Sequence, residues 1–192
     1  MIQVQEMLVV TAGRESEAVK RLESLFDLMA QQPSFRDALV GRGIEDPSRI
    51  LVLHAWERLE DWTTFQASEQ KTAFSASRPS GLYEFEVIGM NWQLEVDSGV
   101  PSGAGAVRRT VYKEGAAPSH GSVVASRTAR YLDDEPRFQG ATLQLSYYDS
   151  PQSYKTNKVP VGRRARAYLA DEGFELVASR ASSRNAAVAS AG

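Results

Sequence analysis

The segment "RILVLHAWERLEDWTTFQAS" (residues 49–68) holds the side chains best suited to chemistry in this sequence. It contains one of the two histidines and two of the three tryptophans. His54 changes charge near neutral pH and is therefore the natural general base. Trp62 and Phe65 are three residues apart on a predicted helix and could stack against a flat ring. The same rings could instead pack that helix against a sheet, and both interpretations stay open.

Strand alternation places Val52, His54 and Trp56 on one face, so Trp56 is either a pocket wall or core. Glu6, on a predicted first strand, is a candidate binding residue if its carboxylate points inward, because burying a carboxylate is costly. The commoner arrangement is an outward, solvated glutamate. Arg78, beside the turn "RPSG", could neutralise an anionic substrate, although exposed loop arginines are frequent. These residues are the candidate site.

Composition excludes several classes of protein. The chain has 192 residues, 42% of them hydrophobic, which is enough for a folded core, and its net charge of −2 argues against a nucleic-acid binder. It has no cysteine and two histidines, so cysteine-ligated or histidine-rich metal sites are not expected. The first residues do not have the pattern of a signal peptide, and no run approaches a membrane span. We expect a cytoplasmic protein with no membrane partner.

The first half predicts an α+β domain of the ferredoxin-like type, with the order βαββαβ. One antiparallel sheet would carry both helices on one face. The first helix is indicated by apolar residues at helical spacing and ends at Pro33. The expected strands span residues 2–10, 35–43, 50–56 and 82–94, and the expected helices span 15–31 and 59–75.

A Gly/Ser/Pro-rich linker at 97–106 separates this domain, residues 1–96, from a second half that repeats the pattern in degenerate form. In that half, "DDEPRFQGATLQ" echoes "AQQPSFRDALVG", and "SYYDSPQSY" echoes "HAWERLEDW". Tyr148 then corresponds to Trp56 and Tyr154 to Trp62. The shorter spacing predicts that the second copy has lost or merged its β-hairpin.

The second domain is predicted over 107–181, and residues 182–192 are predicted to be a disordered tail. A helix is expected over 118–135, although a strand over 121–132 is a competing interpretation. The remaining expected elements are strands at 107–112, 138–148 and 174–180 and a helix at 151–171.

The first half resembles the antibiotic biosynthesis monooxygenase family of dimeric α/β-barrel proteins. The resemblance is carried by the opening strand, the "PSF" after the first helix, and the run "DPSRILVLHAWERLEDWTTF". It implies a barrel of two paired sheets, with a pocket between sheet and helices in each domain. The two halves of a tandem chain could form this barrel as an intramolecular pseudo-dimer, which could also pair as a homodimer.

The best-known relatives oxidise aromatic anthrones with molecular oxygen as co-substrate and no bound cofactor. Their third strand carries Asn and Trp, with a Tyr six residues beyond the Trp. Here those positions are Val52, Trp56 and Trp62. A haem-degrading branch uses an Asn, a Trp and a His at positions that are Glu6, Phe65 and Ser75 here, so haem degradation is not expected.

The leading hypothesis is an oxygenase-like enzyme of aromatic, polyketide-type metabolism that binds a small flat substrate. His54 and Trp56 would be catalytic, and the substrate would contact Glu6, Val52, Trp62, Phe65 and Arg78. One alternative is a non-catalytic protein that binds an aromatic ligand or assembles with a partner. Another is a cyclase or isomerase acting on a similar substrate. A cavity into which His54 opens would favour an enzyme.

Overall fold

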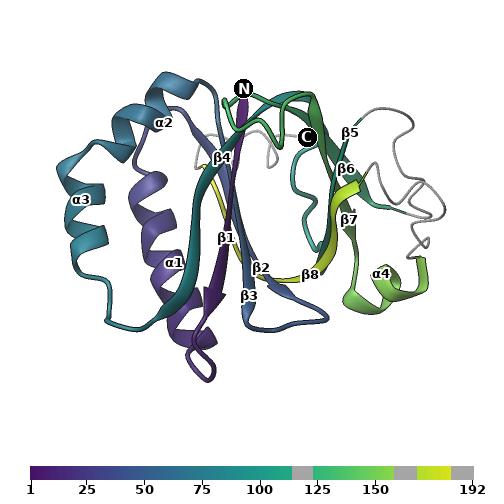
Figure 1. Cartoon of the computed structure of the whole chain (residues 1–192), viewed down its shortest axis with the longest axis horizontal. Helices are drawn as coiled ribbons and strands as arrows, with labels where there is room; N and C mark the ends of the chain where they lie inside the picture. The colour runs from purple at the N-terminus through teal and green to yellow at the C-terminus, as the bar shows by residue number, and fades with distance from the viewer. Residues whose placement is uncertain (114–122, 158–167, 183–192) are drawn as a thin grey trace.

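The computed structural model describes residues 1–113, 123–157 and 168–182 and forms a closed eight-stranded barrel (Figure 1). All neighbouring strands are antiparallel, in the order β1-β3-β2-β8-β5-β7-β6-β4. The strands are β1 (Ile2–Val10), β2 (Phe35–Gly43), β3 (Arg49–Trp56), β4 (Tyr83–Asp97), β5 (Ala106–Lys113), β6 (Ala125–Tyr131), β7 (Ala141–Tyr148) and β8 (Tyr168–Ala181).

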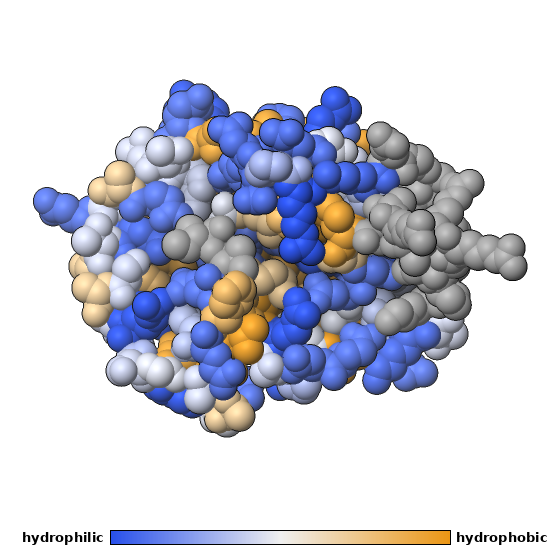
Figure 2. Space-filling model, in the orientation of Figure 1, coloured by the Kyte–Doolittle hydropathy of each residue, from blue (hydrophilic) through white to orange (hydrophobic). Residues whose placement is uncertain are grey.

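The helices lie outside the barrel. Three of them cover the sheet of the first half, and α4 lies on the other side of the molecule (Figure 1). The helices are α1 (Glu15–Met29), α2 (Leu59–Gln66), α3 (Glu69–Ala76) and α4 (Pro151–Asn157). On the face shown in Figure 2 the surface is mostly hydrophilic, and hydrophobic side chains gather toward the middle.

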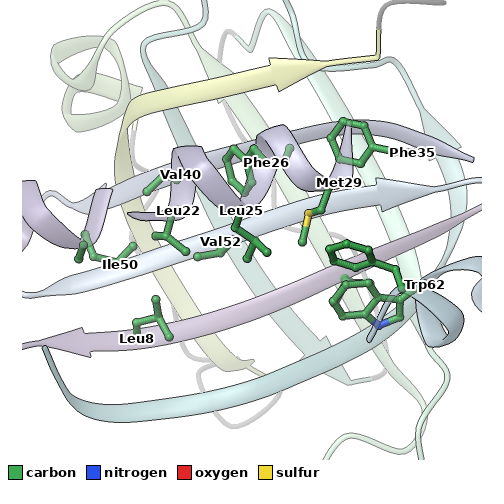
Figure 3. Packing of buried hydrophobic residues seen from close by; sticks show 14 of the residues in the cluster. Leu8, Leu22, Leu25, Phe26, Met29, Phe35, Val40, Ile50, Val52 and Trp62 are labelled. Carbon is green, nitrogen blue, oxygen red and sulfur yellow. The ribbon is translucent and has the colours of Figure 1, made fainter. Parts of the chain in front are cut away.

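Two hydrophobic cores share the strands of the first half. Alternate residues of β1 and β3, such as Leu8, Ile50 and Val52, face α1 and α2, and Figure 3 shows this packing. The intervening residues, such as Met7 and Leu51, face the barrel interior. Because both faces of these strands are buried, β3 is a nearly continuous apolar run, whereas β1 also carries Gln3, Gln5 and Glu6.

The elements predicted for the first half are confirmed, with one difference. The helix expected at 59–75 is two helices, α2 and α3. Ser68 caps the second helix, and its Oγ accepts a hydrogen bond from the backbone N–H of Lys71 over 3.1 Å.

In the second half the helix predicted at 118–135 is wrong in its described part, where β6 lies; this strand falls within the competing 121–132 interpretation. The prediction that the hairpin was lost is also wrong, since β6 and β7 pair as antiparallel neighbours. The "DDEPRFQG" segment is mostly the loop between them. The helix predicted at 151–171 ends at Asn157, and residues 168–171 already belong to β8. The tail predicted to be disordered lies, from residue 183 on, outside the described residues.

Candidate functional site

A pocket of about 380 Å³ opens between the helices and the sheet of the first half, and we call it the helix-side pocket. Leu22 and Leu25 of α1 and Phe74 of α3 give it apolar walls. Its volume is within the range of small-molecule sites. Among the predicted site residues, Glu6 and Arg78 line it.

Glu6 faces the helices, because even-numbered residues of β1 point to that side of the sheet. Its side chain is only 12% exposed, and it lies opposite Val52 in the β1–β3 register. The outward orientation considered commoner for this residue is therefore wrong. A carboxylate held in so dry a place needs polar support, since its charge is poorly hydrated there.

The imidazole of His54, which is fully buried, lies beside Glu6 but beyond hydrogen-bonding distance. The His54 Nε2 lies 3.7 Å from Oε1 of Glu6 and has no hydrogen-bond partner among the described residues. On the other side of the ring, Trp56 Nε1–H donates to His54 Nδ1 over 2.8 Å. Because Nδ1 accepts this bond, we assign the hydrogen of the neutral imidazole to Nε2, where it points toward Glu6. The lone pair of His54 is thus occupied and does not face the pocket.

The aromatic residues pack on one another instead of opening a slot. Ring centroids are 5.6 Å apart for Trp56 and Trp62, 5.6 Å for Trp56 and Phe65, and 6.1 Å for Trp62 and Phe65. The ring of Trp62 also lies 4.4 Å from that of His54. All are buried and none lines the helix-side pocket, so they form a rigid wall behind Glu6. Val52 belongs to the same core.

Three cationic side chains lie around the pocket, and only Arg78 was predicted. Arg78 forms an ion pair with Glu86, and its guanidinium carbon lies 5.9 Å from the ring centroid of Tyr83. Arg21 stacks over Phe74 at 3.9 Å and bonds the backbone oxygen of the same residue. The side chains of these arginines would favour an anionic ligand at the mouth.

Lys71 and Tyr83 are further polar residues of the lining. Burial raises the pKa of Tyr83, because removal from water disfavours the phenolate. Tyr83 is therefore a neutral hydrogen-bond donor at physiological pH. Arg21, Lys71 and Tyr83 were missed because, in sequence, they resemble any solvated residue on a helix or strand edge.

The described residues contain neither a group of metal ligands nor a membrane-spanning helix. Within the described part of the chain, no three histidine, aspartate or glutamate side chains are grouped as metal ligands would be. In the same residues, no helix has the length and hydrophobicity needed to span a membrane.

The comparisons agree with the fold. Residues 1–77 match the sequence model of the antibiotic biosynthesis monooxygenase family, the family that the first half was found to resemble. A search of the curated proteins finds no match.

Solved structures extend the likeness to nearly the whole chain. An anthrone oxidase-like protein has a TM-score of 0.65 at 12% identity, with 95% of this chain and 93% of that chain covered. A candidate monooxygenase from Lactobacillus acidophilus NCFM has a TM-score of 0.65 at 10% identity, with coverage of 94% and 95%. Another from Fusobacterium nucleatum subsp. nucleatum has a TM-score of 0.68 at 9% identity, with 94% of each chain covered. At these identities the likeness is one of fold.

Proposed function

We propose that this protein is a monooxygenase-type enzyme that oxidises a flat, phenolic, anthrone-like substrate with molecular oxygen in the helix-side pocket. It would use no bound cofactor, and it would act in the cytoplasm on a small aromatic molecule. The family match over residues 1–77 and the fold shared with an anthrone oxidase-like protein support this class of activity. The observation that carries it is the buried, pocket-lining carboxylate of Glu6, backed by His54 and Trp56.

The reaction needs a base, because the substrate must become a carbanion before it can react with oxygen. The sequence favoured His54 for this role. The geometry favours Glu6, which lines the pocket and has a free carboxylate oxygen, whereas Nδ1 of His54 already accepts a bond from Trp56. His54 is then a positioning residue whose N–H stabilises the Glu6 carboxylate, and Trp56 fixes the tautomer of His54.

The proposed oxidation begins at a CH2 group of the substrate. Glu6 takes a proton from a CH2 group activated by the aromatic ketone, and the carbanion passes one electron to O2. The two radicals combine and, with a proton, give a hydroperoxide. Loss of water from the hydroperoxide leaves a carbonyl, so that one CH2 and one O2 become one C=O and one H2O. Arg21 and Arg78 would stabilise the phenolate oxygens of the bound substrate.

The tandem organisation is part of the same proposal. The first half contributes the strand order β4-β1-β3-β2, and the second contributes β8-β5-β7-β6, which is the same order counted within each half. Tyr148 and Tyr154 pack with centroids 5.8 Å apart, much as Trp56 and Trp62 do at 5.6 Å. Two domains, 1–96 and 107–181, joined by 97–106, would thus form a pseudo-dimer.

Oxygen uptake with the anthrone dithranol tests the function. We expect wild-type protein to consume oxygen well above the spontaneous rate, and Glu6→Gln to lower that rate about 100-fold, the low end for a general base. The control is Glu95→Gln, which removes a half-exposed carboxylate of β4 that pairs with Arg130. If Glu6→Gln and Glu95→Gln turn over alike, Glu6 is not the base.

Two other functions keep a specific observation in their favour. A cyclase or isomerase would use the same Glu6 base, and it would convert substrate without oxygen uptake. A non-catalytic binding protein is favoured by the close packing of Trp56, Trp62 and Phe65, which leaves no open slot beside His54. It would bind an anthrone, seen as quenched tryptophan fluorescence, with no turnover.

A further inference from the structure

A second pocket, of about 530 Å³, lies where β1 ends and β8 begins, and we call it the barrel-mouth pocket. It is lined by residues of β1, β3, β4, β5 and β8 and by the loop between β6 and β7. Met7 and Met90, which belong to the inward-facing core, form part of it. The proposed oxidation makes no use of this pocket.

One buried and one partly exposed guanidinium group in this pocket share one carboxylate. Arg109 points inward from β5 with 5% of its side chain exposed, and its Nη1 donates to Oε2 of Glu172 over 2.9 Å. Arg49 of β3 reaches Oε1 of the same glutamate with its Nη2 over 2.6 Å. The Nε atoms of Arg109 and Arg49 are both buried and have no hydrogen-bond partner among the described residues. Both arginines line the pocket, although these two Nε atoms are themselves covered from solvent.

The lining also carries an excess of positive charge. Arg137, in the loop between β6 and β7, is a third arginine of the pocket. The only other acidic residue of the lining is Asp171, and its two oxygens bond Arg108 on the outer face at 2.6 and 2.7 Å. Among the described residues, three arginines thus face the single carboxylate of Glu172.

Burial and the neighbouring charges both change the pKa of Arg109. The pKa of Arg109 is lowered to about 10, chiefly by burial. Glu172 acts in the opposite direction, and the charges of Arg49 and Arg137 contribute to the lowering. Arg109 is still protonated at neutral pH. An additional anion in the pocket would offset a charge that the protein itself leaves only partly compensated.

The rest of the lining is apolar. Phe85 is 60% exposed although it is large and hydrophobic, and Phe138 and Leu169 lie with it in the pocket wall. Exposed aromatic surface beside three arginine side chains matches a ligand that has both a charged head and an apolar body.

We infer that the barrel-mouth pocket binds an organic carboxylate with an apolar ring or chain. The planar carboxylate suits guanidinium donors, which bind two-oxygen acceptors through paired N–H groups. Phe85, Phe138 and Met90 would contact the apolar body. This binding is independent of the oxidation proposed for the helix-side pocket.

Calorimetric titration with 2-naphthoate tests the inference. The neutral analogue 2-naphthalenemethanol and the small anion acetate are the ligand controls, because each lacks one of the two recognised features. Arg49→Gln and Arg137→Gln each remove one cation from the pocket, and Arg137 is an exposed loop residue whose loss leaves the fold intact. Arg42→Gln is the matched protein control: Arg42 is 43% exposed and pairs with Glu175 of β8, as Arg49 is 42% exposed and pairs with Glu172, but it does not line the pocket.

We expect wild-type protein to bind 2-naphthoate at least tenfold more tightly than either control ligand. Arg49→Gln and Arg137→Gln should each weaken binding about tenfold, the effect of losing one charge-assisted contact, and Arg42→Gln should leave it unchanged. Arg78→Gln should also leave it unchanged, because Arg78 belongs to the helix-side pocket. The inference is overturned if 2-naphthoate does not bind, if 2-naphthalenemethanol binds equally well, or if Arg78→Gln weakens binding while Arg49→Gln and Arg137→Gln do not.

Discussion

Arg127 and Asp37 form a two-point ion pair inside the barrel, with Nη1–Oδ1 and Nη2–Oδ2 distances of 2.9 and 2.5 Å. Nε of Arg127 bonds Oδ1 of Asp97 over 2.6 Å, and its Nη1 also donates to Oε1 of Gln3 over 3.1 Å. Arg127 comes from β6, whereas its three partners come from β2, β4 and β1. One buried guanidinium therefore connects the second half of the chain to three strands of the first.

Replacing Arg127 by methionine should lower the free energy of unfolding by about 3–5 kcal/mol, because Asp37 and Asp97 would keep their charges without a buried partner. Arg130→Met is the control, since Arg130 lies three residues away on the same strand and pairs with Glu95 at the surface. That change should cost less than about 1 kcal/mol. Urea denaturation of both variants measures the difference, and equal losses would show that the buried ion pair does not hold the barrel together.

The same arginine explains why β6 was predicted as a helix. Its inward positions are Ala125, Arg127, Ala129 and Tyr131, so the buried face carries a charge and two small residues. Alternation of hydrophobic and polar residues is the main sign of a strand in sequence. In β6 this alternation is broken, because the charged Arg127 stands at an inward position and pairs with Asp37. By contrast, β1, β3 and α1 bury apolar side chains at regular spacing, and their boundaries were predicted within two residues.

Of the residues that line the helix-side pocket, only Glu6 and Arg78 were predicted as site residues. His54, Trp56, Trp62 and Phe65 do meet, because strand alternation and helical spacing fix the faces of β3 and α2. The side of the sheet taken by Glu6 could not be deduced in this way, since both faces of β1 are buried and no polar face marks the outside. Which of Glu6 and His54 borders the pocket depends on how α1 and α3 pack, and local sequence does not encode this.

Trp56→Phe should release His54 from the tautomer that the indole imposes. In wild-type protein we expect the neutral imidazole to carry its hydrogen on Nε2, because Trp56 donates to Nδ1 over 2.8 Å. Without that donor a buried acceptor is left unpaired, at a cost of about 1–3 kcal/mol, and both tautomers become populated. Nitrogen-15 chemical shifts of His54 measure the tautomer. Wild-type shifts typical of a hydrogen on Nδ1 would contradict the assignment.

Alkaline pH should weaken the fold through buried tyrosines. Burial raises the pKa of Tyr147, in the barrel, and that of Tyr83, beside the helix-side pocket, above the ordinary value of 10.0. Above about pH 10 the unfolded chain loses these protons while the folded protein retains them. The folded state then binds more protons, so the free energy of unfolding falls as pH rises through this window.

Tyr147→Phe tests this expectation, because it removes the phenol and leaves the ring that packs in the barrel. Urea denaturation between pH 8 and pH 11 should give a shallower loss of stability for Tyr147→Phe than for wild-type protein. Parallel stability curves for the two proteins would show that Tyr147 ionises at its ordinary pKa in the folded state.

Because Gly173 has no side chain, the ring of Tyr154 can lie directly against its backbone. A Cβ atom at position 173 would lie 2.2 Å from two ring carbons of Tyr154 and 2.6 Å from its hydroxyl oxygen, so Gly173→Ala forces the tyrosine to move. Overpacking of this kind costs about 1–3 kcal/mol. The smaller side chain of Tyr154→Leu should make room, so that Gly173→Ala costs less in that background.

Gly41→Ala is the comparison for this double-mutant cycle. Its Cβ would lie 2.7 Å from Cβ of Phe174, away from Tyr154, so its cost should be the same with tyrosine or leucine at position 154. Denaturation of wild-type protein, the three single variants and the two double variants gives both coupling energies. If Tyr154→Leu relieves Gly173→Ala no more than Gly41→Ala, the close approach of β8 to α4 does not explain why glycine stands at position 173.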